Sequence, residues 1–554
     1  MKKVVVGIAL CGFLALPAAA GAATINVDTL IDESTNDTTC SLREAIKSAN
    51  LNSNAHEDAC TAGQSTDDFV SLQAGTYTLT GADGEDANVS GDLDVTAGGP
   101  LTVDGTVDGG EVPTTTISGG GVDRIFDLRP DAAQIDFFAQ RLLLRNGAVA
   151  GTNDGGAIRI ADPDADFGLS TSRVQQNDAG GNGGAIYFDD ATAGYTFDVS
   201  QVQFSQNNAD DEGGAIYLDT PQDTNATIDR STLLENTAGT MGGGAYVESA
   251  GSTNQEPVLQ FINSTLSGNT ADTGGGAVAF DFGAGGTVWF RFSTIAYNST
   301  PKLGAGGGIF TNSADQFVLF QGGTILASNA AGGVLANCAG PGDFQTSGYN
   351  LDSGNSCHLN AASPKFDKIN TNPLLGTSSI NPPGVATTET LGLYALSPAL
   401  DAVPRTPTDK CDINPFSTTE VDQRFVTRPI APAGLCDMGA FEGSLGAAQD
   451  GDSDTVLDPT DNCILDQNTN QANNDADLLG DVCDPDDDND AVLDAADNCP
   501  TQAGPPSNAG CPAPAAAPPS GNPVTPVVPA KKCKKKKKKH SASVAKKKCK
   551  KKKK

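Results

Sequence analysis

A repeat of about 30 residues in the middle of the chain limits the possible folds more than any other feature. A glycine pair followed by a small residue and usually an aliphatic one recurs, and an apolar residue three positions before an asparagine keeps the same period. The pairs begin at Gly155, Gly183, Gly213, Gly243, Gly275 and Gly306, and the asparagines are Asn146, Asn177, Asn207, Asn236, Asn269, Asn298 and Asn329. Two columns with one period predict a solenoid of stacked repeats.

Between these repeated positions, apolar and polar residues alternate as in β-strands, for example in "AIYFDD" and "AIYLDT", and there is no helical periodicity. They predict an all-β chain with a right-handed parallel β-helix over residues 69–345, starting at "FVSLQAGTYTLT". We expect the glycines to turn corners, and the asparagines to adopt left-handed corner conformations and stack their amides. Residues 140–335 resemble the polymorphic outer-membrane-protein family, whose GGAI and FxxN repeats form surface-exposed β-helices.

A compact helix signal, "CSLREAIKSAN", precedes the repeats. Ser41 and Glu44 have capping-box spacing, and Leu42, Ala45, Ile46 and Ala49 fall on one apolar face. The stretch matches the motif that names the CSLREA domain of bacterial surface proteins. We therefore expect an N-terminal cap over residues 24–68, with this helix covering the open end of the solenoid. Ser41, Arg43 and Glu44 are expected to cap the helix and form ion pairs.

Residues 346–443 resemble the choice-of-anchor Q module, which often ends such β-helices. The matching pieces are "SGYNLDS", "NPLLG", "SPALDA", "DQR" at Asp422 and "CDMGAFEG" at Cys436. The resemblance implies a C-terminal part of the solenoid, with Asp422, Gln423 and Arg424 stabilising its C-terminal end.

The chain begins like an exported protein. Lys2 and Lys3 precede an apolar run from Val4 to Leu16, and small residues follow, which predicts a signal peptide over residues 1–23 cleaved after Ala20, Ala22 or Ala23. No later stretch has the length of a membrane span. Export to a bacterial surface or medium permits disulfides, and proximity in sequence suggests the pairs Cys40–Cys60, Cys338–Cys357, Cys411–Cys436, Cys463–Cys483 and Cys499–Cys511.

The strongest chemical signal lies between residues 450 and 511, where three loops repeat one spacing of oxygen ligands. Carboxylates or amides at positions 1, 3, 5, 9 and 12 converge on a hard cation when such a loop wraps it, and calcium suits this donor set. The backbone carbonyls at position 7 are further candidates. The side chains are Asp450, Asp452, Asp454, Asp458 and Asp461, then Asn473, Asp475, Asp477, Asp481 and Asp484, then Asp486, Asp488, Asp490, Asp494 and Asp497, and the carbonyls are those of Val456, Leu479 and Val492.

With its alternating cysteines, this segment resembles thrombospondin type 3 repeats. The resemblance implies that bound calcium and disulfides, rather than an apolar core, hold it together. Position 6 is usually glycine in that family but is Thr455, Leu478 and Ala491 here, which predicts weaker affinity. The half-repeat from Thr501 to Cys511 lacks acidic residues and is expected to bind nothing. The alternative is an acidic disordered linker.

The chain ends in a Pro/Ala-rich spacer over residues 512–530 and a disordered tail over residues 531–554 with 16 lysines. The whole chain has 35 basic and 68 acidic residues, so the rest is strongly acidic and no specific nucleic-acid binding is expected. Such a tail binds polyanions such as wall polymers, acidic lipids or extracellular DNA; a merely solubilising tail is the alternative. The candidate contacts are Lys531, Lys532, Lys534, Lys535, Lys546, Lys547, Lys550 and Lys551.

These features favour a calcium-binding surface protein with a structural or adhesive role, whose β-helix is a candidate for binding glycans or another cell. The alternative is a secreted polysaccharide lyase or glycoside hydrolase on a pectin-lyase-like β-helix. For that alternative, Asp189-Asp190 and Asp210-Asp211 would lie in corresponding turns, and Arg159 would be the basic residue. The "GHG" and "RIK" pieces of polygalacturonases are missing, so we assign no catalytic residue.

Overall fold

The computed structural model describes residues 23–512 except 54–58, 65–66, 82–87, 97–98, 130–134, 162–165, 190–195, 221–224, 250–258, 283–285, 380–387, 405–420, 430–434, 446–453, 457–459, 464–466, 476–479, 485, 491, 493, 495–496, 506–507 and 509. The expected signal peptide up to residue 22, Cys411 and the tail lie outside the described residues.

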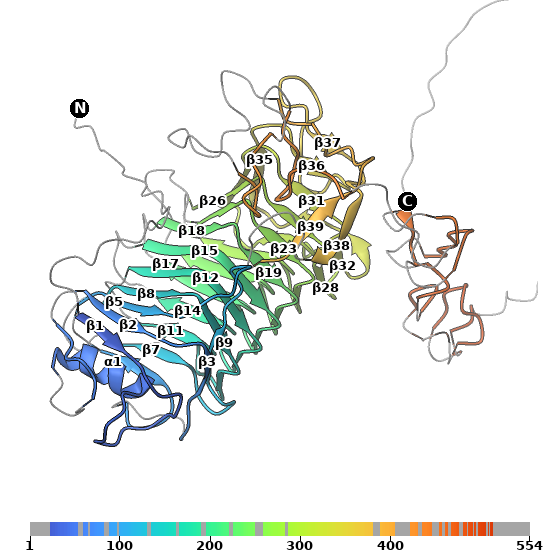
Figure 1. Ribbon diagram of the computed structural model, residues 1–554. Coiled ribbons are helices and arrows are strands. Elements are labelled where there is room, and N and C mark those ends of the chain that lie inside the picture. Colours follow the sequence, from blue (N-terminus) through green and yellow to red (C-terminus); the bar gives the residue numbers. More distant parts are fainter. Residues whose placement is uncertain are drawn as a thin grey trace, which may run out of the picture.

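The described residues between Ala23 and Ile369 form a parallel β-solenoid, with strands of successive coils stacked in register (Figure 1). The largest sheet contains twenty strands and bends around two sides of the coil. Its strands are β1 (Ala23–Asn26), β2 (Asp68–Ser71), β3 (Gly75–Thr78), β5 (Leu101–Asp104), β6 (Thr115–Ser118), β8 (Phe137–Gln140), β9 (Leu142–Arg145), β12 (Phe167–Gln175), β15 (Thr196–Ser205), β18 (Asn225–Asp229), β19 (Thr232–Leu234), β22 (Leu259–Ile262), β23 (Thr265–Ser267), β26 (Thr287–Arg291), β27 (Thr294–Ala296), β30 (Phe317–Phe320), β31 (Ile325–Ala327), β35 (Asp343–Thr346), β36 (Leu351–Asp352) and β37 (Lys368–Ile369).

Two further sheets complete the coil, and a short antiparallel pair lies outside it. The nine-stranded sheet comprises β4 (Leu93–Val95), β7 (Phe126–Leu128), β11 (Ile158–Ile160), β14 (Ile186–Asp189), β17 (Ile216–Thr220), β21 (Ala245–Ser249), β25 (Val278–Phe282), β29 (Ile309–Thr311) and β34 (Cys338–Ala339). The eight-stranded sheet comprises β10 (Ala148–Val149), β13 (Asp178–Ala179), β16 (Asn208–Ala209), β20 (Thr237–Ala238), β24 (Thr270–Ala271), β28 (Ser299–Thr300), β32 (Ala330–Ala331) and β33 (Val334–Leu335), and the outer pair is β38 (Leu375–Ser379) with β39 (Thr390–Leu393).

The repeat produces this stacking because equivalent residues pair across coils. Ile158 pairs with Ile186 and Ile186 with Ile216, all fully buried inside the solenoid. The predicted register is wrong at one coil: Ile216 pairs with Ala245, so the corner glycine is Gly242 rather than Gly243. A run of three glycines, residues 242–244, hides this shift in the sequence.

The buried asparagines form a continuous amide ladder along the solenoid. Each side-chain NH₂ donates to the carbonyl oxygen of the next amide at 2.8–2.9 Å. Its members are Asn177, Asn207, Asn236, Asn269, Asn298, Asn329 and Asn337.

The amide stacking is therefore confirmed, but the assignment of the left-handed corner was wrong. The preceding residue adopts that conformation, for example Gln206 at φ 55° and Glu235 at φ 54°. Asn146 was also misplaced, because Gly147 occupies the ladder position and donates its N–H to Asn177 at 2.8 Å.

The predicted helix forms as α1 (Leu42–Leu51) and lies at the N-terminal end of the stack (Figure 1). Ser41 caps it, the Glu44 side chain accepts the Ser41 N–H, and the expected apolar face is buried. Arg43 is 1% exposed and forms an ion pair with Asp32 at 2.8 Å, as expected. One feature differs: β1 precedes the helix and pairs with β2, so the first strand of the solenoid comes before its cap.

The DQR segment lies against the side of the coils rather than at their C-terminal end. The Gln423 amide donates to the Thr232 hydroxyl of β19 at 2.7 Å and accepts from the Thr265 hydroxyl of β23 at 2.7 Å. Asp422 and Arg424 form a buried ion pair at 2.6 Å. A second apolar core, which includes Phe292, Ile325, Leu391, Leu393 and Phe441, joins this C-terminal part to β27 and β31.

Four of the expected disulfides are confirmed: Cys40–Cys60, Cys338–Cys357, Cys463–Cys483 and Cys499–Cys511. Cys436 is also disulfide-bonded, but its expected partner, Cys411, lies outside the described residues.

Candidate metal centre

The aspartate-rich segment is built of loops, and Figure 1 draws it apart from the stacked coils. Among its described residues there is no α-helix and no strand. Cys463 is the only apolar residue buried after Phe441 in the described part of the chain. The order of this segment therefore depends on polar contacts, disulfides and any bound ion.

The third predicted loop brings three carboxylates together. Asp486, Asp488 and Asp490 each offer one oxygen, and these oxygens lie within 4.8 Å of one another. They occupy positions 1, 3 and 5 of the predicted spacing. Alternate carboxylates therefore lie together in this loop, and such a cluster of hard oxygen donors can hold a divalent cation.

Short backbone turns fix one oxygen of several carboxylates. Asp488 Oδ1 accepts the Asp490 N–H at 3.3 Å, Asp497 Oδ1 accepts the Cys499 N–H at 2.6 Å, and Asp461 Oδ1 accepts the Cys463 N–H at 2.8 Å. The other oxygen of each of these aspartates is buried without a hydrogen-bond donor.

In the predicted spacing, Asp488 is position 3 of the third loop, Asp497 is position 12 of the third loop, and Asp461 is position 12 of the first loop. A buried acceptor without a donor is unfavourable, and a bound cation would supply the missing partner. The residues present therefore fit a calcium ion.

Desolvation, and then repulsion between carboxylates, raises the pKa of two aspartates in the third loop. The pKa of Asp487 is raised to about 6, first by desolvation and then by the charge of Asp494. The pKa of Asp488 is also raised, by desolvation and then by Asp490. A divalent cation would reverse these shifts, so its binding would release protons.

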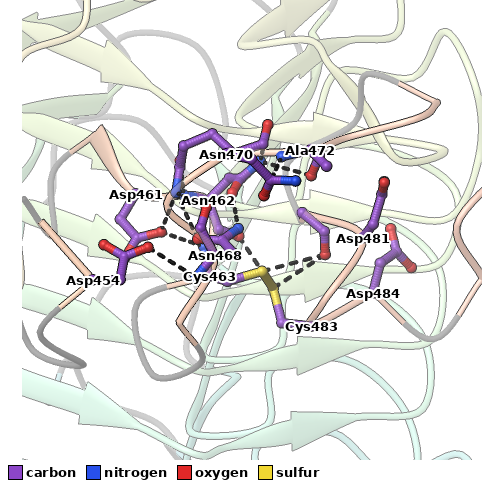
Figure 2. The surroundings of a disulfide bond; sticks show 12 residues. Asp454, Asp461, Asn462, Cys463, Asn468, Asn470, Ala472, Asp481, Cys483 and Asp484 are labelled. Atoms are coloured by element: carbon purple, nitrogen blue, oxygen red, sulfur yellow. Dashed lines mark hydrogen bonds between the residues drawn. A yellow bond between two sulfur atoms is a disulfide. The ribbon is translucent and has the colours of Figure 1, made fainter. Parts of the chain in front are cut away.

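The Cys463–Cys483 bridge joins the first two loops, with Asp454 and Asp461 on one side and Asp481 and Asp484 on the other (Figure 2). Amides hold Asp454, whose oxygens accept the N–H groups of Val456 at 2.7 Å and Asn468 at 2.8 Å. Thr455, at the usual glycine position, has φ 82°. A β-branched residue is strained there, which supports the expectation of weaker affinity in this loop.

The remaining predicted ligands are not gathered into a second cluster within the described part of the segment. Asn473, Asp475 and Asp494 are described, and Asp494 Oδ1 accepts the Asp487 N–H at 3.0 Å. Val492 donates its N–H to Asp490 at 2.9 Å. The predicted ligands outside the described residues are Asp450, Asp452, Asp458, Asp477 and Leu479.

A second acidic cluster lies on the solenoid, where sequence reasoning did not predict one. The carboxylates of Asp92, Asp94 and Asp127 converge: Asp92 immediately precedes β4, and Asp94 on β4 lies directly opposite Asp127 on β7. Arg124 already supplies a cation there, because its Nη1 lies 3.1 Å from Asp92 and 3.0 Å from Asp127.

The environment of this cluster is a buried ion-pair network. The pKa of Asp92 is raised to about 8, by burial and then by Asp123. Arg159, proposed above as a candidate base, pairs with Asp127 at 3.3 Å. The signal that could have identified the cluster is the one-coil separation between Asp94 and Asp127.

The carboxylates considered for hydrolysis do not occupy corresponding turns, so that expectation was wrong. Asp189 ends β14 and pairs with Asp219, whereas Asp210 follows β16 of the other sheet, and its N–H donates to the Ala179 carbonyl at 2.9 Å. Asp190 lies outside the described residues.

Comparisons with known proteins identify two repeats. Residues 472–507 match the thrombospondin type 3 repeat, and residues 201–219 match the Chlamydia polymorphic membrane protein repeat. No curated protein and no solved structure matches the chain. Thrombospondin type 3 repeats are known to bind calcium, and the two repeats together fit a surface or adhesive β-helix protein. Of the described residues only α1 is α-helical, and its ten residues are too few to cross a membrane.

Proposed function

We propose that this chain is an exported, calcium-binding surface protein with a structural or adhesive role. One observation carries the proposal: the oxygens of Asp486, Asp488 and Asp490 converge inside the matched thrombospondin repeat. The buried oxygens of Asp488 and Asp497 that lack donors support the same conclusion.

In this proposal the third loop holds calcium through Asp486, Asp488 and Asp490, with Asp497 completing the loop. The other two predicted loops supply weaker sites. The Cys463–Cys483 and Cys499–Cys511 bridges keep the loops close, and the ion then replaces the apolar core that the described segment lacks. The segment becomes a stiff arm extending from the solenoid.

The rest of the chain is assigned a role at the cell surface. The N-terminal features and the disulfides support export. We assign residues 24–68 to the CSLREA type and residues 346–443 to the choice-of-anchor Q type on their sequence motifs. The lysine-rich tail would retain the protein on an anionic wall or lipid surface, and the solenoid would face glycans or another cell.

Calorimetric calcium titration of the oxidised full-length protein tests the metal assignment. We expect binding below millimolar calcium, and Asp486→Asn/Asp488→Asn/Asp490→Asn should remove at least one bound ion per chain. The matched control, Asp178→Asn/Asp210→Asn/Asp272→Asn, changes three exposed solenoid aspartates and should leave the stoichiometry unchanged. Wild-type protein that takes up no calcium at millimolar concentration would overturn the proposal.

A further inference from the structure

The outer face of the nine-stranded sheet carries two parallel rows of side chains. One row contains the carboxylates of Asp189, Asp219, Glu248 and Asp281, which pair in register across β14, β17, β21 and β25. Two residues earlier on the first three strands lie Tyr187, Tyr217 and Tyr246, whose rings stack at 5.1 and 5.5 Å between centroids. We call these seven residues the acidic tyrosine face.

Neighbouring strands lie about 4.8 Å apart, so the carboxylates of this face repel one another. The pKa of Asp219 is raised to about 6 by desolvation, then by Glu248 and Asp189. Glu212 adds a further negative charge beside this face. Its pKa is raised by desolvation and then by the charge of Glu248, which shows that the two carboxylates interact.

On the neighbouring strand β11, Arg159 lies opposite Tyr187, but its guanidinium pairs with Asp127. Tyr217 donates its hydroxyl to Glu248 at 2.9 Å, and Asn312 donates to Asp281 at 2.9 Å, but no described lysine or arginine pairs with the four carboxylates. Glu248 is exposed and the other three are half-buried, so a ligand can reach them. The four carboxylates are not among the described groups that could hold a metal ion, because their oxygens are spread along the solenoid axis rather than gathered at one point.

A row of negative charge fixed on rigid strands suits an extended polycation better than a single ion. The chain itself contains one, with 16 lysines in residues 531–554. Pro512 is the last described residue, and 18 proline-rich residues, 513–530, separate it in sequence from the lysines. A stretch of 18 residues can span at most about 60 Å, whereas nine stacked strands extend over about 40 Å.

We propose that the lysine-rich segment 531–554 docks on the acidic tyrosine face of the solenoid, of its own chain or a neighbouring copy. The other acidic region of the chain, the aspartate-rich segment, is the competing site. The choice between them rests on the proposed function, because calcium would neutralise the aspartate-rich loops and leave the in-register carboxylates of the solenoid face without ion pairs. An external polyanion would then have to displace this contact to capture the tail, so docking regulates surface attachment.

The test uses full-length oxidised protein in saturating calcium at low salt. A zero-length carbodiimide cross-linker joins carboxylates to lysines, and mass spectrometry locates the joined peptides. We expect links from residues 531–554 to the peptides that carry Asp219, Glu248 and Asp281. A mixture of isotopically light and heavy protein distinguishes links within one chain from links between copies, and either origin supports docking.

Tryptic release of the tail gives a second readout that does not depend on the cross-linking chemistry. Asp219→Asn/Glu248→Gln/Asp281→Asn keeps the shape of the face and should speed release at least fivefold. Asp178→Asn/Glu235→Gln/Asp272→Asn removes the same charge from exposed positions elsewhere on the coils and should stay within twofold of wild type. Equal release rates in all three proteins, or links only to residues 450–511, would overturn the proposal. Calcium uptake is measured separately by calorimetry, so that a failure of the proposed function can be told apart from a failure of docking.

Discussion

Asn236 shows how much a single side chain contributes to this solenoid. It is fully buried; its side-chain oxygen accepts the Asn207 side-chain NH₂ at 2.9 Å, and its own NH₂ donates to the Phe204 carbonyl at 3.1 Å. Asn236→Ala would leave these groups without partners in a site closed to water. We expect a loss of about 3–5 kcal/mol in the free energy of unfolding, since each buried unsatisfied group costs about 1–3 kcal/mol.

Urea unfolding followed by circular dichroism measures this loss. The matched control is Gln206→Ala, an exposed residue adjacent to the ladder whose amide donates to Glu235 at 3.0 Å. That substitution should cost less than about 0.5 kcal/mol. Similar losses for both variants would show that the ladder adds nothing beyond general packing.

The N-terminal cap depends on one buried arginine of α1. The Arg43 guanidinium pairs with Asp32 and donates to the carbonyls of Gly91 and Asp92, both at 2.7 Å, which ties the helix to the chain entering β4. Arg43→Met would remove the cation that pairs with the Asp32 carboxylate, which would keep its hydrogen bonds from Thr80, and would leave two carbonyls without their donor. We therefore expect a destabilisation of about 3–5 kcal/mol.

Hydrogen exchange with mass spectrometry locates the effect of this change. Exchange should accelerate over residues 42–51 and 91–95, while residues 259–346, several coils away, remain protected because solenoid coils contact only their neighbours. Lys47→Met on the same helix is the control, since its half-buried amine contacts only Ser34 among the described residues. Uniform acceleration along the whole solenoid would contradict a local cap.

The elements with periodic or paired signals could be predicted from the sequence. The repeated glycines and asparagines predicted the coils, the spacing of Ser41 and Glu44 predicted the helix, and the proximity of cysteines in the sequence predicted the disulfides. The rest depends on contacts between distant residues. β1 is four residues long without a repeat mark, and Gln423 meets Thr232 across 191 positions. At the metal centre, spacing predicted the Asp486–Asp490 cluster, but not which oxygens backbone amides would occupy.

The whole molecule combines two kinds of stabilisation, and they respond differently to calcium removal. The solenoid buries a continuous apolar core and the amide ladder, neither of which involves a metal. The aspartate-rich segment has no comparable core among its described residues and relies on loops joined by Cys463–Cys483 and Cys499–Cys511.

Excess chelator, with disulfides intact, should therefore abolish hydrogen-exchange protection in residues 454–505 and leave the melting temperature of the solenoid within about 2 °C of its calcium-loaded value. Differential scanning calorimetry and hydrogen exchange of the full-length protein measure both quantities, and magnesium in equal concentration is the control for charge screening alone. A large fall in the solenoid's melting temperature would mean that calcium is also bound among the coils. The acidic cluster around Arg124 would then be the first place to look, because it is the other grouping of three carboxylates in the described chain.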